Sequence, residues 1–156
     1  MNYIDVLRES EDMVTPGMSA CQGCGGELIL RTVLQVAGKK YNYWYSSRLH
    51  GWCWRCWLEL FQWFEKIPVH IPLLDNTASF FDWAESDVLE KKGRGDVNII
   101  AVAGDGATAD CGFQSLSAAA ERNEKMLYIC YDNEGYMNTG YQRSSTTTKG
   151  SRTSTT

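Results

Sequence analysis

The chain has 156 residues, which suits one domain, and 44% of them are hydrophobic, enough to bury a core. A formal net charge of −4 at pH 7 gives no basic surface of the kind that binds nucleic acid. No apolar run is long enough to cross a membrane, and the first residues are polar rather than a targeting segment. Six cysteines in this context are typical of a reduced cytoplasm and not of a disulfide scaffold. We therefore expect a cytoplasmic protein that binds neither nucleic acid nor membrane.

The first motif along the chain is a C-x-x-C pair, Cys21 and Cys24. This spacing puts two thiolates on one tight turn, and Gly23 and Gly25 let the backbone bend around a metal cluster. Apolar residues that share roughly one face predict a helix over 27–37. Because the N-terminus of that helix would stabilise negative charge on the sulfurs, the pair predicts a metal or cluster site.

A second C-x-x-C pair, Cys53 and Cys56, follows at a separation that zinc ribbons use. By spacing alone, the four cysteines would form a structural zinc site. A non-catalytic zinc or iron–sulfur binding module that uses all four cysteines is therefore one alternative function.

Residues 41–66, which contain the second pair, differ in composition from the rest of the chain. They hold five of its six tryptophans and follow the period of neither a strand nor a helix. The single tryptophan codon, TGG, becomes a glycine codon when it is read one base later. In that frame the segment becomes a strand-like run, a turn with one cysteine and a glycine-rich loop. We predict that 41–66 is an anomalous segment produced by a compensated pair of frameshifts; the alternative is a genuine aromatic insertion.

Two apolar, partly β-branched runs predict adjacent parallel strands at 97–103 and 126–131. Between them, apolar residues at helical spacing predict a helix over 113–120. A right-handed crossover then brings the carboxyl ends of the two strands side by side, where open α/β sheets bind ligands. An earlier run, 67–74, predicts an edge strand. These elements predict an α/β fold.

Polar residues follow both central strands, with Gly-Asp-Gly at 104–106 and Asp-Asn-Glu at 132–134. Asp105 and Asn133 should therefore converge, beside glycines that let the backbone approach an anion. A carboxylate and a carboxamide are hard oxygen ligands, and a phosphate can complete the coordination shell of Mg²⁺. The pattern predicts a magnesium-bound diphosphate site.

Two other interpretations of these residues stay open. Residues 104–109 also fit the G-x-G-x-x-A fingerprint of dinucleotide-binding sites, with Asp132 where a ribose-binding acid would lie. Asp105 counts against that interpretation, because a carboxylate without a metal repels a pyrophosphate. A glycine turn with no ligand is the other possibility.

The diphosphate motif resembles the thiamine-diphosphate motif of the 2-oxoacid:ferredoxin oxidoreductases. The residues that carry the resemblance are 104–106 and Asp-Asn-Glu-Gly-Tyr-Met-Asn-Thr-Gly at 132–140, and the β subunit of the pyruvate type is most similar. Residues 21–26 resemble the N-terminal cluster motif of the same family. Together the similar regions cover about residues 1–40 and 93–156.

The resemblance implies a thiamine-diphosphate-binding fold, with a mostly parallel sheet and helices on both faces. One domain would span 1–156 and lack its C-terminal part, so that the chain is a fragment. The Ser/Thr-rich end, 140–156, reads by composition as a disordered linker; the resemblance makes it a loop over the cofactor.

The resemblance also implies the magnesium ligands and the reactive site. Asp105 and Asn133 would hold Mg²⁺ through their side chains, with the backbone carbonyl of Gly135 as a third ligand. Asn138 and Thr139 would lie beside the thiazolium ring and the substrate as catalytic residues.

Cys21 and Cys24 would be two of the four ligands of a [4Fe-4S] cluster. The residues implied to bind the cofactors are Gly23, Cys24, Gly25, Gly104, Asp105, Gly106, Ala107, Asn133, Gly135, Tyr136, Asn138 and Thr139.

The implied activity is the oxidative decarboxylation of pyruvate, or a related 2-oxoacid, to acyl-CoA and CO₂. Electrons would pass through the cluster to ferredoxin. The implied partners are an α subunit, γ and δ subunits, ferredoxin, coenzyme A and the 2-oxoacid, and the isolated chain would be inactive. A non-oxidative thiamine-diphosphate enzyme, which has no use for Cys21 and Cys24, is the remaining alternative.

Overall fold

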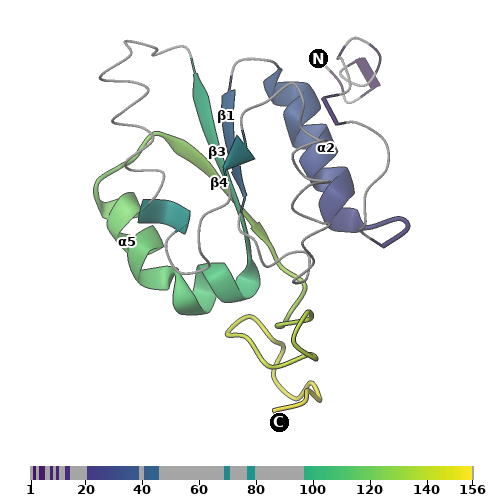
Figure 1. Ribbon diagram of the computed structural model, residues 1–156, viewed down its shortest axis with the longest axis vertical. Helices are drawn as coiled ribbons and strands as arrows, with labels where there is room; N and C mark the ends of the chain where they lie inside the picture. The colour runs from purple at the N-terminus through teal and green to yellow at the C-terminus, as the bar shows by residue number, and fades with distance from the viewer. Residues whose placement is uncertain are drawn as a thin grey trace.

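The computed structural model describes residues 21–38, 41–45, 69–70, 77–79 and 97–155, together with isolated positions before residue 21. Within these residues no helix combines the length and the apolar character needed to cross a bilayer. The elements in chain order (Figure 1) are α2 (Gly25–Ala37), β1 (Tyr41–Tyr45), β2 (Val69–His70), β3 (Asn98–Gly104), the short π-helix η2 (Gly106–Cys111), α5 (Phe113–Glu121) and β4 (Met126–Tyr131).

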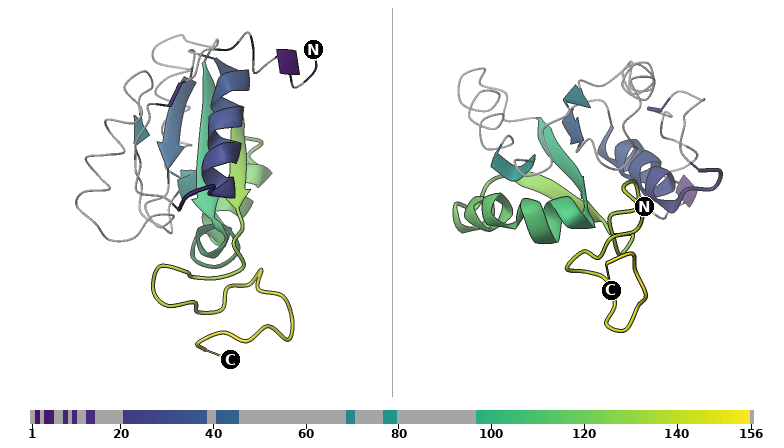
Figure 2. Two further views of the ribbon diagram at one scale, coloured as in Figure 1. Left: turned by 90° about the vertical axis from the view of Figure 1, so that its right-hand side faces the viewer. Right: turned by 60° about the horizontal axis from the view of Figure 1, so that its bottom comes forward.

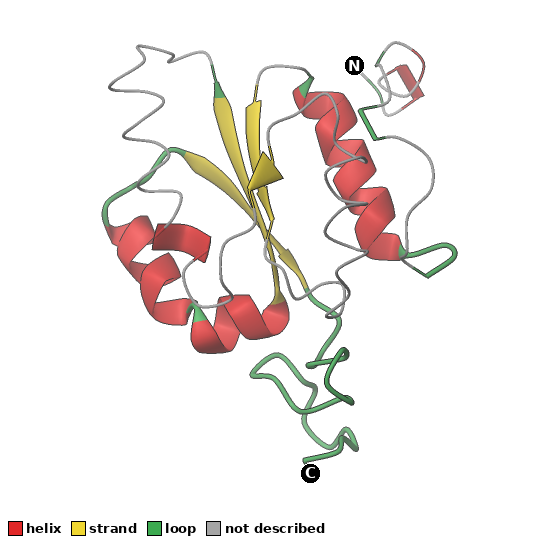
Figure 3. Ribbon diagram, viewed as in Figure 1, coloured by secondary structure: helices red, strands yellow, loops and turns green. Residues whose placement is uncertain are grey.

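The four described strands form one parallel sheet in the order β2-β1-β3-β4 (Figure 3). The register of β3 and β4 runs from Ile99 opposite Met126 to Gly104 opposite Tyr131. Both strands therefore end at the same level, and the residues that follow them meet at one edge. The predicted strands and their side-by-side carboxyl ends are confirmed, and β2 lies at the edge of the described sheet, as predicted.

The helices α2 and α5 lie on opposite faces of the sheet (Figures 1 and 2). Successive residues of a strand point to opposite faces, so β4 contacts both layers. The Tyr131 ring lies against α2, where a Cβ built on Gly26 would be 2.6 Å from it. On the other face the Tyr128 hydroxyl lies 3.2 Å from Thr108 Oγ1 in η2. The predicted helices at 27–37 and 113–120 are both present, and the α/β fold is confirmed.

The core is centred on β3, whose residues 99–103 are all buried. Ile99 and Ala101 pack against Met126 and Tyr128 of β4. Burial of each large aliphatic side chain contributes about 1.5–3 kcal/mol to the stability of the fold. A strand that is buried on both faces is an unbroken apolar run in the sequence, so β3 could be predicted from the sequence. On α2, Leu30 and Leu34 are buried one turn apart, as an amphipathic helix requires.

Two features differ from the sequence predictions. Residues 106–111, for which the sequence predicted no helix, are wound into η2. β1 pairs with both β2 and β3, so a regular strand begins the segment in which no strand period was found. Residues 46–66, including Cys53 and Cys56, lie outside the described residues, and the frameshift stays a prediction.

Candidate functional site

The first site residue, Asp105, follows β3 directly and caps the N-terminus of η2. Its backbone already has helical angles, with φ −58° and ψ −44°, so the chain turns sharply where the strand ends. The side chain is only 3% exposed. The Thr108 hydroxyl donates to the Gly104 carbonyl at 2.7 Å and fixes this turn. A buried carboxylate is costly unless it is paired, so its neighbours decide what the site can hold.

The second site residue, Asn133, is presented by a turn at the end of β4. The Glu134 amide donates to Asp132 Oδ1 at 2.8 Å, and Glu134 has a positive φ of 62°. This Asx turn reverses the chain and directs the Asn133 amide at Asp105. With the Asn133 amide turned to complement its neighbours, Nδ2 donates to Asp105 Oδ1 at 3.1 Å and to the Gly135 carbonyl at 2.7 Å.

These three groups fit a hard cation. In the opposite orientation of the amide, the Asn133 oxygen takes this place, 3.1 Å from Asp105 Oδ1 and 2.7 Å from the Gly135 oxygen, so that three oxygens lie close together. Three converging oxygens repel one another unless a cation lies between them, and carboxylate, amide and backbone oxygens are the ligands Mg²⁺ takes. In the described part of the chain, no group of three His, Cys, Asp or Glu side chains could bind a metal. The fit therefore depends on this mixed donor set alone.

A cavity of about 50 Å³ opens beside these groups. Nine of the twelve predicted cofactor-binding residues line it; only Gly23, Cys24 and Gly25 do not. The full lining is Gly104, Asp105, Gly106, Ala107, Asn133, Gly135, Tyr136, Met137, Asn138 and Thr139. The volume exceeds what a single water needs but is far below that of a pocket for a whole cofactor.

Two glycines of the cavity wall are required by close contacts. A Cβ on Gly106 would lie 2.3 Å from the Tyr136 ring, and a Cβ on Gly135 would lie 2.9 Å from the Gln142 carbonyl. The Gln142 contact belongs to a short antiparallel bridge, in which the Tyr136 amide donates to the Gln142 carbonyl at 2.9 Å. The bridge closes a loop that holds Asn138 and Thr139, both exposed, at the mouth of the cavity.

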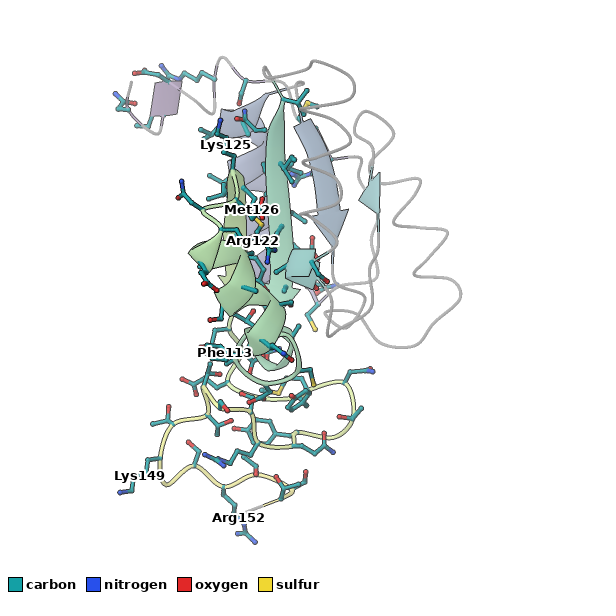
Figure 4. All side chains as sticks on the ribbon, turned by 90° about the vertical axis from the view of Figure 1, so that its left-hand side faces the viewer. Phe113, Arg122, Lys125, Met126, Lys149 and Arg152 are labelled. Carbon is teal, nitrogen blue, oxygen red and sulfur yellow. The ribbon has the colours of Figure 1, made fainter. Side chains whose placement is uncertain are left out.

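The C-terminal segment lies beyond the carboxyl edge of the sheet. In Figure 4, Lys149 and Arg152 lie at the far end of this segment, opposite Met126 at the start of β4. Ser144, which is 2% exposed, donates to Asp105 Oδ2, and Thr146 Oγ1 lies 3.1 Å from the same oxygen. The segment is thus a loop hydrogen-bonded to Asp105 and not the free linker that its composition predicted, and its place over a cofactor stays a prediction.

A second set of hydrogen bonds surrounds Tyr136. Its hydroxyl donates to Asp110 Oδ2 at 2.8 Å, and the Ser145 amide donates to Asp110 Oδ1 at 3.1 Å. Burial, together with the hydrogen bond to Asp110, raises the pKa of Tyr136 well above its ordinary value. Sequence reasoning missed Asp110, Ser144 and Thr146. The only signal for Ser144 and Thr146 was the hydroxyl-rich composition of 140–156, and Asp110 had no signal in the sequence.

Residues 88–156 match the family of the thiamine pyrophosphate enzyme, C-terminal TPP binding domain. The pyruvate synthase subunit PorB of Methanothermobacter marburgensis is 42% identical over 146 residues, which cover 93% of this chain and 49% of that protein. The chain belongs to the β-subunit family of the 2-oxoacid:ferredoxin oxidoreductases.

Two further relatives show the breadth of this β-subunit family. The ketoisovalerate oxidoreductase subunit VorB of Pyrococcus furiosus is 36% identical, with 94% of this chain and 47% of that protein covered. The NADH-dependent phenylglyoxylate dehydrogenase subunit beta of Aromatoleum evansii is 40% identical, with 99% and 34% covered. This chain therefore spans about half the length, or less, of these curated relatives.

The cysteine motif of this chain lies at the start of α2, with Cys24 at the N-cap. The Cys24 amide donates to the Cys21 carbonyl at 3.0 Å, so the two residues share the expected tight turn. Both are free thiols, and Cys21 is exposed. Cys53 and Cys56, the other half of the zinc alternative, lie outside the described residues. The structure places Gly23, Cys24 and Gly25 at this turn and not at the cavity.

Proposed function

We propose that this chain supplies the magnesium and diphosphate site of a thiamine-diphosphate-dependent 2-oxoacid:ferredoxin oxidoreductase. The observation that carries the proposal is the convergence of the Asp105 carboxylate, the Asn133 amide and the Gly135 carbonyl beside a cavity. The match of residues 88–156 to the thiamine pyrophosphate domain supports the cofactor. The dinucleotide alternative has no comparable support.

Asp105, Asn133 and Gly135 would hold Mg²⁺, and the ion would bind the diphosphate. Gly104 leaves the backbone at the cavity wall open to an anion, because no atom lies within 4 Å of the place that its Cβ would take. Bound thiamine diphosphate supplies the nucleophilic carbon and the electron sink that 2-oxoacid decarboxylation requires. The small cavity suits the diphosphate end of the cofactor, so the remaining walls would come from the rest of the subunit and from an α subunit.

Asn138 and Thr139 would face the substrate, since both are exposed at the mouth of the cavity. The Thr139 hydroxyl donates to Gln142 Oε1, and Gln142 Nε2 donates to the Thr139 carbonyl at 2.7 Å. These bonds hold the Thr139 side chain in one orientation. We assign both residues the role of positioning the 2-oxoacid against the ring.

Cys21 and Cys24 would provide two of the four ligands of a [4Fe-4S] cluster that passes electrons to ferredoxin. Their position supports this role, because a helix N-terminus stabilises the negative charge of thiolates. Cys24 also lies beside the last residue of β4, which directly precedes the turn that carries Asn133. The end of β4 would therefore support both the cluster and the cofactor site. The acyl group formed from the 2-oxoacid would pass to coenzyme A.

We propose pyruvate as the substrate. The names of the relatives mention pyruvate, ketoisovalerate and phenylglyoxylate, which are all 2-oxoacids. The assignment to the 2-oxoacid class rests on what these three substrates share. A γ and a δ subunit are proposed as further partners.

The function can be tested with the chain coexpressed with its α, γ and δ subunits. We expect CO₂ release from pyruvate that requires coenzyme A, an electron acceptor, Mg²⁺ and thiamine diphosphate. The Cys24→Ser variant should lose electron transfer but keep thiamine diphosphate bound. Decarboxylation that needs no electron acceptor would instead support the non-oxidative alternative, and one zinc per chain without thiamine diphosphate would support the zinc module.

A further inference from the structure

The two oxygens of the Asp105 carboxylate have different neighbours. Oδ1 faces the Asn133 amide at 3.1 Å, on the side of the Gly135 carbonyl. Oδ2 accepts a hydrogen bond from Ser144 and lies 3.1 Å from Thr146 Oγ1. One oxygen therefore faces the candidate ion, and the other is held by the C-terminal loop.

The hydroxyls that hold Oδ2 are themselves fixed in place. The Thr147 hydroxyl donates to the Glu134 carbonyl at 2.6 Å and accepts from the Ser144 amide at 2.9 Å. Thr146 Oγ1 lies 2.9 Å from Asp132 Oδ1, so its proton lies between two carboxylates. Thr146 and Thr147 thus tie the loop to the turn after β4, and the bond from the Ser144 amide to Thr147 holds the Ser144 backbone beside Asp105.

This arrangement allows Asp105 to bind a cation through one oxygen only. A bidentate carboxylate would need Oδ2 as well, and that oxygen would first have to give up its two hydroxyl neighbours. Mg²⁺ takes monodentate carboxylates in a tight octahedron at about 2.0–2.1 Å, whereas Ca²⁺ takes six to eight ligands at about 2.3–2.6 Å and readily accepts bidentate carboxylates. The hydroxyls thus favour the smaller ion.

We propose that Ser144 and Thr146 are positioning residues that keep Asp105 monodentate and so select Mg²⁺ over Ca²⁺ at this site. The inference rests on the proposed magnesium site and adds what determines its selectivity. It also couples the loop to the ion, because the hydroxyls that orient the ligand are the ones that hold the loop in place. Partners of metal ligands commonly change metal affinity by about 10–100-fold when they are removed.

The test uses the full 156-residue chain with saturating thiamine diphosphate. Mn²⁺ bound to the site is followed by its electron paramagnetic resonance signal, and Mg²⁺ and Ca²⁺ are added separately as competitors. The wild type should bind Mg²⁺ more tightly than Ca²⁺. In Ser144→Ala and in Thr146→Val, the ratio of the two affinities should fall by about tenfold, chiefly because Ca²⁺ binds more tightly.

The matched control is Thr146→Ser, which keeps the hydroxyl and should keep the wild-type ratio. An unchanged ratio in both hydroxyl-deleting variants, or equal weakening of both ions, would overturn the inference and leave the magnesium site intact. Failure of the wild type to bind any divalent ion would overturn the proposed function as well. If Ser144→Ala does not fold, Thr146→Val still tests the inference.

Discussion

The hydroxyl of Tyr131 lies 3.8 Å from the Sγ of Cys24. Tyr131 is the last residue of β4, and the turn that presents Asn133 begins at the next residue. Cys24 and Tyr131 are 107 residues apart in sequence, and their contact brings the cysteine turn to the strand end that precedes Asn133. A cluster on Cys24 would be close to the cofactor without any further structural element between them.

Replacement of this hydroxyl should alter the cluster and leave the fold intact. Tyr131→Phe keeps the ring that packs on α2 near Gly26 and removes the hydrogen bond to Cys24. Because hydrogen bonds to cluster sulfurs raise the reduction potential, we expect a lower potential in the assembled enzyme, measured by a redox titration. Tyr128→Phe, on the opposite face of β4, is the matched control. Equal potentials in wild type and Tyr131→Phe would contradict a hydrogen bond from Tyr131 to a cluster ligand at Cys24.

The close contact between Gly106 and Tyr136 predicts that a side chain at position 106 destabilises the fold. Removal of the Tyr136 ring should relieve this effect. Gly106→Ala would put a Cβ 2.3 Å from the Tyr136 ring. We therefore expect the free energy of unfolding, measured in urea, to fall by about 1–3 kcal/mol. In the Tyr136→Ala background the same substitution should cost much less. A double-mutant cycle measures the difference; additive effects would show that the contact is not the cause.

Tyr136 should make stability depend on pH in the alkaline range. Burial and the bond to Asp110 raise its pKa above the ordinary value near 10, so the folded state keeps this proton at a pH where the unfolded chain has lost it. Stability should therefore fall as the pH rises above about 10. Tyr136→Phe should show a shallower fall in urea denaturation between pH 9 and pH 11. Parallel curves for the two proteins would contradict the shift.

A second carboxylate at the candidate ion site should make the stability of the fold depend on bound Mg²⁺. In Asn133→Asp, the new carboxylate would lie about 3 Å from Asp105 Oδ1, and the repulsion should destabilise the metal-free chain by about 1–3 kcal/mol. Added Mg²⁺ should restore the lost stability. The measurement is the midpoint of thermal unfolding with MgCl₂ and with EDTA. A variant that is equally stable in both would place the ion elsewhere.

The frameshift prediction can be checked in the coding DNA. β1 pairs on both sides, and a strand inside a parallel sheet normally has an apolar, β-branched sequence that Tyr-Asn-Tyr-Trp-Tyr does not have. Sequencing across codons 36–95 should reveal compensating insertions or deletions of bases on either side of 41–66. An intact frame through Trp52 and Cys53 would make the aromatic segment genuine and restore the zinc alternative.

The elements of the fold that could be predicted are those with a local signal. The strands β3 and β4 are unbroken apolar runs, and each ends at polar residues that build the site. Asp105 and Asn133 were found because parallel strands that are neighbours bring their ends together, whatever the details of packing.

The missed features depend on contacts between distant residues. Ser144 and Asp105 are 39 residues apart, and no local pattern links a serine in a hydroxyl-rich segment to one carboxylate. The π-helix η2 is likewise held partly from outside, by the Tyr136 hydroxyl on Asp110. Such insertions in helices are frequent near functional sites and have no period of their own in sequence.

The most direct test of the central claim is a calorimetric titration of the full chain with thiamine diphosphate, in Mg²⁺ and in EDTA. We predict binding that requires Mg²⁺ and weakens at least about tenfold in Asp105→Asn, which keeps the shape of the side chain but loses its charge. Glu121→Gln, at the exposed end of α5, should bind as the wild type does. Equal binding in EDTA, or an Asp105→Asn variant with wild-type affinity, would contradict the magnesium site.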